Sequence, residues 1–160
     1  MGPRMEQKTV AIGVDHGGLV LKVELIALLM EQGFTPLDLG THDTQSVDYP
    51  DFAYEVAEAI RDGRAELGLL VCGTGIGMSI AANRFPWIRA GLCHDVTTAR
   101  LAREHNDANV LTLGARLVAP ELAKECLTVF LQTEFGAARN VARVRKLTEP
   151  PVLDDASNAA

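Results

Sequence analysis

Short runs of apolar residues alternate with longer amphipathic segments along most of this chain. Five runs rich in branched apolar residues predict strands at Thr9–Val14, Phe34–Leu39, Leu67–Cys72, Ile88–Cys93 and Val110–Leu113. The intervening segments repeat apolar residues at helical spacing and predict helices at Gly17–Gln32, Pro50–Asp62, Gly75–Arg84, Asp95–His105 and Pro120–Thr133. This regular alternation predicts an α/β fold in which helices cover both faces of a parallel sheet.

Individual residues refine this arrangement. Pro36 lies inside the second predicted strand and has no N–H to donate, so we expect that strand at or near an edge of the sheet. Gly33 and Gly63 follow predicted helices, as C-terminal caps do. The first helix is apolar around most of its circumference between Leu19 and Met30, which is more than one sheet face can cover. We expect a second subunit to cover the rest.

The composition is that of a single acidic domain. Of 160 residues, 48% are hydrophobic, and the formal net charge is −6. We place one domain at residues 8–148, preceded by residues 1–7, which we expect to be disordered or added for expression, and followed by a flexible tail at residues 149–160. The negative charge disfavours partners such as nucleic acid or an anionic membrane, because both need a basic face. No apolar stretch approaches the length of a membrane span.

The three cysteines, Cys72, Cys93 and Cys126, are odd in number, and each lies within an apolar pattern. A disulfide framework is therefore not expected, and we predict a reducing, cytoplasmic location. The spacing provides neither a Cys-x-x-Cys pair nor a Cys/His zinc motif. Dithiol redox chemistry and a zinc site of that type are accordingly not expected.

Polar side chains follow four of the predicted strands at the point where each strand ends. Those residues are Asp15 and His16 after the first strand, Cys72 at the end of the third, His94 and Asp95 after the fourth, and Arg116 after the fifth. Parallel sheets bind ligands outside the carboxyl ends of their strands. We therefore expect a carboxylate, imidazoles, a thiol and a guanidinium to gather at one edge.

Cys72 immediately precedes a glycine-rich turn, Gly73-Thr74-Gly75-Ile76-Gly77, that leads into a predicted helix. Glycines let backbone N–H groups surround an anion, and the start of a helix adds positive potential, so an oxyanion and a thiolate are both favoured. The simpler alternative is that Cys72 is a small buried hydrophobe.

Comparison with known motifs argues against several functions for this glycine-rich turn. Its third glycine comes one residue too early for the dinucleotide-binding fingerprint, and no Lys followed by Ser or Thr completes a P-loop. A cysteine phosphatase needs an arginine six residues after its nucleophile, where this chain has Met78. A single thiol acting as base or nucleophile beside an anion-binding loop remains.

Further candidate residues lie toward the C-terminus. Arg139 and Arg143 are four residues apart on a predicted helix, with Lys146 one turn further along, so three cations share one face. Such guanidinium groups suit a phosphate, and the alternative is a solvated helix face. His105 closes a predicted helix, where the helix dipole favours a protonated imidazole. The sequence leaves two alternative roles for His105, proton transfer and capping of the helix.

Several motifs occur together in this chain. They are Asp15-His16-Gly-Gly, Asp48-Tyr49-Pro50, Cys72-Gly-Thr-Gly-Ile-Gly-Met-Ser-Ile-Ala-Ala-Asn83, His105-Asn106-Asp107-Ala-Asn109 and the arginine pair near the end. Between about Lys8 and Leu147 the chain resembles the type B ribose-5-phosphate isomerase family. The resemblance implies a three-layer α/β/α sandwich with a five-stranded, Rossmann-like parallel sheet, and neither a metal nor another cofactor. It also implies a homodimer or homotetramer with interfacial active sites and the C-terminal helix packed on a partner subunit.

The implied reaction converts an aldose phosphate, ribose 5-phosphate, into a ketose phosphate, ribulose 5-phosphate, by moving a proton between C2 and C1. The resemblance makes Cys72 the base, Thr74 a residue that orients it or bonds an oxygen, and His105 the residue that opens the sugar ring. It implies that the enediolate, the sugar and the phosphate are bound by Asp15, His16, Tyr49, Gly73, Gly75, Ile76, Gly77, Asn106, Arg116, Arg139 and Arg143.

Alternatives remain within and outside this family. Some relatives carry the base as a glutamate at the position of Met78 and lack the cysteine, so this chain falls in the thiol branch. Others act on allose 6-phosphate, galactose 6-phosphate or a four-carbon phosphate, and the sequence does not give the pocket depth that separates them. A galactose-6-phosphate isomerase of this family has two different subunits, although this chain has every motif itself. A non-catalytic module that binds a phosphorylated metabolite is the alternative of another class.

Overall fold

The strands form one parallel sheet in the order β2-β1-β3-β5-β4. Their bounds are β1 Thr9–Val14, β2 Thr35–Asp38, β3 Leu67–Cys72, β4 Ala90–Leu92 and β5 Val110–Gly114. The computed structural model that shows them describes residues 8–136 and 138–153. Every residue of the central strand β3 is buried, as expected for a parallel sheet that is covered on both faces.

Different local features explain why β2 lies at an edge of the sheet and why β4 is short. β2 is an edge strand, as predicted from Pro36, which pairs with Val10 of β1. β4 forms the other edge and is shorter than predicted. Its ladder begins only at Ala90, because the N–H of Arg89 donates to the side chain of Asn109 at 2.8 Å instead of to a neighbouring strand.

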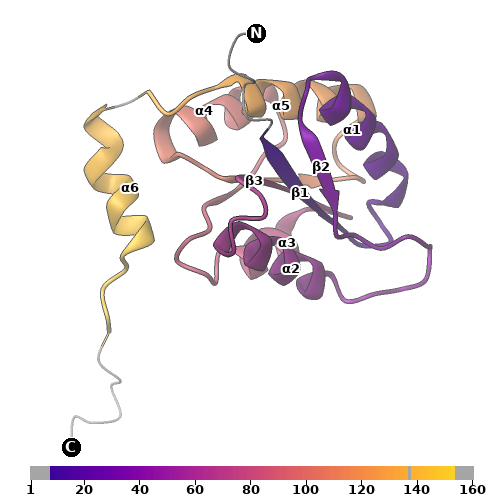
Figure 1. Cartoon of the computed structure of the whole chain (residues 1–160), viewed down its shortest axis with the longest axis horizontal. Helices are drawn as coiled ribbons and strands as arrows, with labels where there is room; N and C mark the ends of the chain where they lie inside the picture. Colours follow the sequence, from indigo (N-terminus) through magenta and orange to yellow (C-terminus); the bar gives the residue numbers. More distant parts are fainter. Residues whose placement is uncertain (1–7, 137, 154–160) are drawn as a thin grey trace, which may run out of the picture.

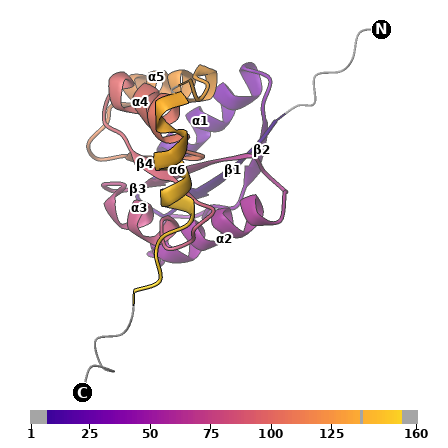
Figure 2. The same ribbon diagram turned by 90° about the vertical axis from the view of Figure 1, so that its left-hand side faces the viewer.

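Helices cover both faces of the sheet, so the predicted three-layer α/β/α architecture is confirmed (Figures 1 and 2). One face carries α1 Leu19–Glu31, α4 Val96–Asn106 and α5 Pro120–Gln132, and the other carries α2 Tyr49–Arg61 and α3 Ile76–Ala82. Each face has its own buried cluster, one around Leu25, Leu29 and Phe130 and the other around Val56 and Met78.

The glycines predicted to cap helices do so in the structure. Gly33 and Gly63 follow α1 and α2 with positive φ angles of 84° and 72°, which glycine adopts without strain. The outer face of α1 is apolar and exposed at Val20, Val23 and Met30. Its burial by a second subunit stays a prediction.

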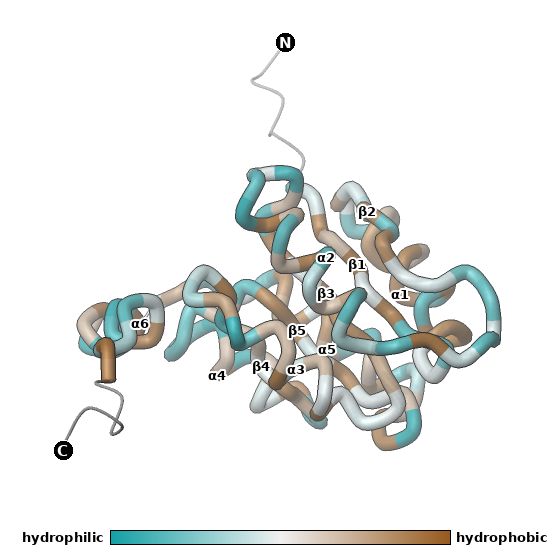
Figure 3. The backbone as a smooth tube through the Cα atoms, turned by 90° about the horizontal axis from the view of Figure 1, so that it is seen from below, coloured by the Kyte–Doolittle hydropathy of each residue, from teal (hydrophilic) through white to brown (hydrophobic). Residues whose placement is uncertain are grey.

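The C-terminal helix begins later than the sequence indicates. A 3-10 turn, η1 Ala138–Asn140, precedes α6 Val141–Thr148, so the prediction that Arg139 lies on this helix is wrong. Asn140 is the last residue of η1 and the N-cap of α6, and its Oδ1 accepts from the guanidinium of Arg143 and, among the described residues, from no backbone N–H. α6 has no buried residue and is set apart from the body (Figures 1 and 3).

The remaining segments add little to the fold. In the part of the chain that the structure describes, no helix is long and apolar enough to cross a membrane. Val152 and Leu153, in the predicted tail, are 95% and 83% exposed. Residues 1–7 and 154–160 lie outside the described residues, so the expectations for both ends stay predictions.

Candidate active site

A pocket of about 460 Å³ opens at the carboxyl ends of the central strands β1, β3 and β5. It is lined by Asp15, His16, Gly17, Tyr49, Cys72, Gly73, Thr74, Ile76, Gly77, Ile80 and Arg116. A carboxylate, an imidazole, a thiol and a guanidinium therefore meet here. His94 and Asp95 do not line this pocket, contrary to expectation, because β4 lies beyond β5 at the edge. Asp95 instead caps α4 by accepting from the N–H of Thr98 at 2.8 Å.

Cys72 ends β3, and the following loop holds its sulfur. The residue is 5% exposed, and the N–H of Gly75 donates to its Sγ at 3.1 Å. A donor in this position stabilises negative charge that develops on the sulfur. Gly75 has φ +78°, and a Cβ there would lie 2.6 Å from Cδ1 of Leu92, so only glycine lets the loop turn back beneath the thiol.

The other two thiols are buried in the core on the opposite face of the sheet. Burial raises the pKa of Cys93 to about 11 and the pKa of Cys126 to about 11. Both thiols therefore stay protonated at neutral pH. Neither lines the pocket, which leaves Cys72 as its thiol.

The glycine loop presents backbone donors beside Cys72. Within the described residues, the N–H groups of Gly73, Thr74 and Gly77 have no protein acceptor, whereas the N–H of Ile76 donates to Oγ1 of Thr74 at 3.3 Å. Unpaired N–H groups at the edge of a pocket can bind an anion or a developing oxyanion. The ring of Tyr49 packs directly on Gly77, where a Cβ would lie 2.5 Å from its ring carbons.

The loop after β1 and Arg116 complete this pocket. Asp15 is 6% exposed, and its Oδ1 accepts from the N–H of Gly17 at 2.8 Å. The N–H of Val47 donates to Nδ1 of His16 at 3.3 Å, which leaves the proton of the neutral ring on Nε2. Arg116 lies against Gly73, whose carbonyl accepts from its backbone N–H at 3.0 Å.

The remaining predicted residues form a second cluster. His105, Asn106, Arg139, Asn140 and Arg143 line a separate pocket of about 430 Å³. The guanidinium of Arg143 donates to Oδ1 of the buried Asn140 at 2.7 Å. Cations and an imidazole are thus gathered where α4, η1 and α6 meet, away from Cys72.

Connectivity explains why the two clusters do not meet within one chain. α4 runs from the end of β4 back to the start of β5, so its last turn, with His105, lies at the edge where the strands begin. Cys72 pairs with Gly114 at the edge where the strands end. The five residues of β5 alone span roughly 16 Å between these edges.

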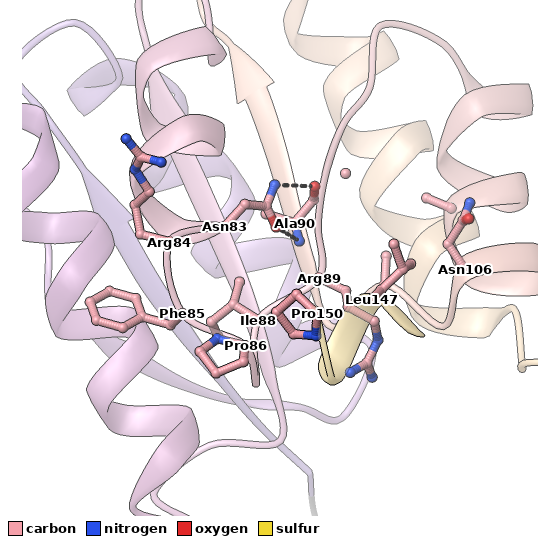
Figure 4. A pocket seen from close by; sticks show the side chains of 13 residues that line it. Asn83, Arg84, Phe85, Pro86, Ile88, Arg89, Ala90, Asn106, Leu147 and Pro150 are labelled. Atoms are coloured by element: carbon pink, nitrogen blue, oxygen red, sulfur yellow. Dashed lines mark hydrogen bonds between the residues drawn. The ribbon is translucent and has the colours of Figure 1, made fainter. Parts of the chain in front are cut away.

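Apolar surface accompanies both clusters. A groove of about 510 Å³ lies beside Asn106, and Figure 4 shows the side chains lining it, with Leu147 from α6 and Pro150 from the segment that follows. Ile76 and Ile80, at the rim of the Cys72 pocket, are 50% and 57% exposed. Exposed apolar residues beside polar pockets are typical of surfaces that another molecule covers.

Some of the residues now seen at or near these pockets were not predicted. Ile80 follows Ile76 by one helical turn, and this spacing could have identified it. Asp107 stood inside a recognised motif but received no role. Arg89 and Arg103 both contact Asp107. Arg103 precedes Asp107 by four residues, a spacing that could have identified the pair, whereas no sequence signal marks Arg89, because the pairing of β4 with β5 brings it to Asp107.

Known proteins resemble this chain over most of its length. A family model described as Ribose/Galactose Isomerase matches residues 10–147. Ribose-5-phosphate isomerase B of Escherichia coli K12 is 44% identical over 141 residues, covering 88% of this chain and 95% of that protein. D-erythrulose-4-phosphate isomerase of Pectobacterium atrosepticum is 43% identical over 140 residues, covering 87% and 92%. The solved structure of Clostridium thermocellum ribose-5-phosphate isomerase B matches with a TM-score of 0.86 at 48% identity, covering 88% of this chain and 95% of that one.

Proposed function

Because this chain belongs to the ribose/galactose isomerase family, we propose that it interconverts ribose 5-phosphate and ribulose 5-phosphate. One observation carries the proposal. The sulfur of Cys72 accepts a hydrogen bond from a loop in which the N–H groups of Gly73, Thr74 and Gly77 have no acceptor among the described residues. An aldose–ketose isomerase needs both parts, a base for the C2 proton and donors for the enediolate oxygens.

In the proposed reaction the Cys72 thiolate removes the proton from C2 of the open-chain aldose. The electron pair of that C–H bond forms the C1–C2 double bond, and charge develops on O1 beside the loop N–H groups. O2 then loses its proton, O1 is protonated, and the thiol returns its proton to C1. Oγ1 of Thr74 accepts from the N–H of Ile76, which leaves its own hydroxyl proton for an enediolate oxygen. Protons pass between the substrate and the groups of the site while the electron pairs stay within the substrate, so no step requires a redox cofactor.

A second subunit completes the site in this proposal. Support comes from the separation of His105 from Cys72 within one chain, from the lack of buried residues in α6, and from the exposed apolar rims. In a two-fold assembly α6 of one subunit packs on its partner and brings its cluster over the partner's Cys72 pocket. His105 then moves a proton between the C1 hydroxyl and the ring oxygen to open the furanose.

In this two-fold assembly each of the remaining polar site residues has a role in binding the substrate or in opening its ring. Asn106 binds a sugar hydroxyl, and Asp15 and Tyr49 assist ring opening from the Cys72 side. The phosphate is bound by His16 and Arg116 of one subunit with Arg139 and Arg143 of the other, which suit bidentate contacts. A cytoplasmic location agrees with the three free thiols.

Mixing two defective variants tests the shared site. Cys72→Ser and His105→Asn each damage every site of their own assembly. After subunit exchange at a 1:1 ratio, about a quarter of the sites combine a wild-type Cys72 with a wild-type His105, so activity should recover to about a quarter of the wild-type value. Turnover of ribose 5-phosphate is measured before and after exchange.

The control mixture pairs Cys72→Ser with the double variant Cys72→Ser/His105→Asn, which can form no intact site. Recovery no greater than in this mixture would contradict a site shared between subunits.

A four-carbon substrate is the second candidate, favoured by the 43% identity to D-erythrulose-4-phosphate isomerase. Proton NMR in D₂O distinguishes the candidates with the purified chain alone, using ribose 5-phosphate, allose 6-phosphate, galactose 6-phosphate and erythrulose 4-phosphate. We expect deuterium incorporation with the highest kcat/KM for the five-carbon pair. Exchange with erythrulose 4-phosphate only would move the assignment to four carbons. No exchange with any of them would contradict the isomerase and favour a non-catalytic binding module.

A further inference from the structure

The last turn of α4, which carries His105 and Asn106, ends at a residue with unusual backbone geometry. Asp107 has φ +45° and is the only non-glycine residue with positive φ in the described part of the chain. Its N–H donates to the carbonyl of Arg103 at 3.0 Å and closes the turn. A left-handed residue directly after Asn106 stops the helix there, at a cost that surrounding contacts must offset.

Two arginines hold Asp107 in this conformation. Nε of Arg89 donates to its carbonyl oxygen at 2.8 Å, and a terminal guanidinium nitrogen donates to Oδ2 at 3.1 Å. Arg103 donates to Oδ1 at 3.0 Å. The arginine side chains are only 17% and 16% exposed, so water screens these ion pairs less than those on an open surface.

The arginines are themselves anchored to other elements. The backbone N–H of Arg89, directly before β4, donates to the side chain of Asn109, directly before β5. Nε of Arg103 donates to the carbonyl of Thr133 at 3.2 Å, and its guanidinium lies 5.5 Å from the ring centre of Phe130 on α5. Asp107 therefore ties the end of α4 to the sheet and to α5 at once.

We propose that Asp107 is a positioning residue that fixes the direction in which His105 projects, and thereby sets the rate of ring opening in the partner's site. This inference rests on the proposed function. Asp107 lines a different pocket from His105, so it acts through the backbone and not through contact with the sugar. A displacement of about 1 Å of an acid–base group can cost on the order of 10²-fold in rate, which is the scale expected here.

Asp107→Asn tests the proposal, because asparagine tolerates positive φ but lacks the charge that both arginines bind. We expect kcat for ribose 5-phosphate to fall by about 10- to 100-fold, with KM little changed. Exchange of the C1 proton of ribulose 5-phosphate should stay near the wild-type rate. That ketose has no ring to open, since its C5 oxygen carries the phosphate.

Asp62→Asn is the matched control, because Asp62 is also the C-cap of a helix and is also bound by an arginine, Arg61, but lines neither pocket. It should leave both rates unchanged. Asp107→Gly, which adopts positive φ without strain, should show the same selective loss as Asp107→Asn and serves if that variant does not fold.

Two other outcomes are separable. A folded Asp107 variant whose two rates keep the wild-type ratio would overturn the positioning role. If the wild-type protein catalyses no proton exchange on any of the sugar phosphates tested, the proposed function itself would be overturned.

Discussion

Replacing Cys72 with serine should lower kcat for ribose 5-phosphate by about 10³-fold while the fold is retained. The hydroxyl can still accept the hydrogen bond that the N–H of Gly75 now gives to Sγ, so the loop keeps its geometry. A serine hydroxyl, however, is too weak a base at neutral pH to remove a C2 proton. Steady-state turnover and deuterium exchange measure the loss, and thermal unfolding verifies that the variant is folded.

The control for this variant is Cys93→Ala, which removes a thiol from the core on the other face of the sheet. Its kcat should match that of the wild type. Undiminished exchange in Cys72→Ser would move the base to another group of the pocket, of which the nearly buried carboxylate of Asp15 is the first candidate.

Replacing His105 with asparagine should slow one direction of the reaction far more than the other. In the proposed reaction ribose 5-phosphate is bound as a furanose, so without the histidine the protein can use only the small fraction of free aldehyde. We expect a decrease of kcat in this direction of about 10²-fold. Ribulose 5-phosphate is already open, and exchange of its C1 proton through Cys72 should continue at a rate close to that of the wild type.

The same substitution at the other histidine separates ring opening from binding. His16 lines the Cys72 pocket and is proposed to bind the phosphate, so His16→Asn should raise KM for both sugars without favouring one direction. If His105→Asn slows both directions equally, His105 takes part in the proton transfer at C1 and C2, and ring opening belongs elsewhere.

These two variants also bear on how the assembly works. Cys72 and His105 lie at opposite edges of the sheet in one chain, so each proposed site draws its base and its ring-opening group from different subunits. The groove between α6 and the body is lined by apolar residues such as Phe85, Ile88 and Leu147, and in the proposed assembly this surface is suited to packing against the second subunit. Loss of that packing would lower activity even with all site residues present.

The sequence predicts the strands and helices of the body correctly because their signals are local. Apolar spacing identifies the elements, Pro36 identifies an edge strand, and Gly33 and Gly63 mark helix ends with positive φ. The boundaries predicted from the sequence are wrong at two elements, β4 and α6. β4 is short because the side chain of Asn109 accepts from the N–H of Arg89, and α6 starts late because the 3-10 turn η1 precedes it.

By itself, the sequence determined the parallel α/β architecture, the position of Cys72 at a strand end and the glycine loop that follows it, since neighbouring residues specify all three. Only the tertiary structure decided which strand ends meet. The sheet order β2-β1-β3-β5-β4 differs from chain order and leaves His94 outside the pocket. It also placed His105 at the opposite edge and brought Arg89 to Asp107, which Arg103 contacts from one helical turn away. These relations depend on pairing between strands distant in sequence, which no local pattern encodes.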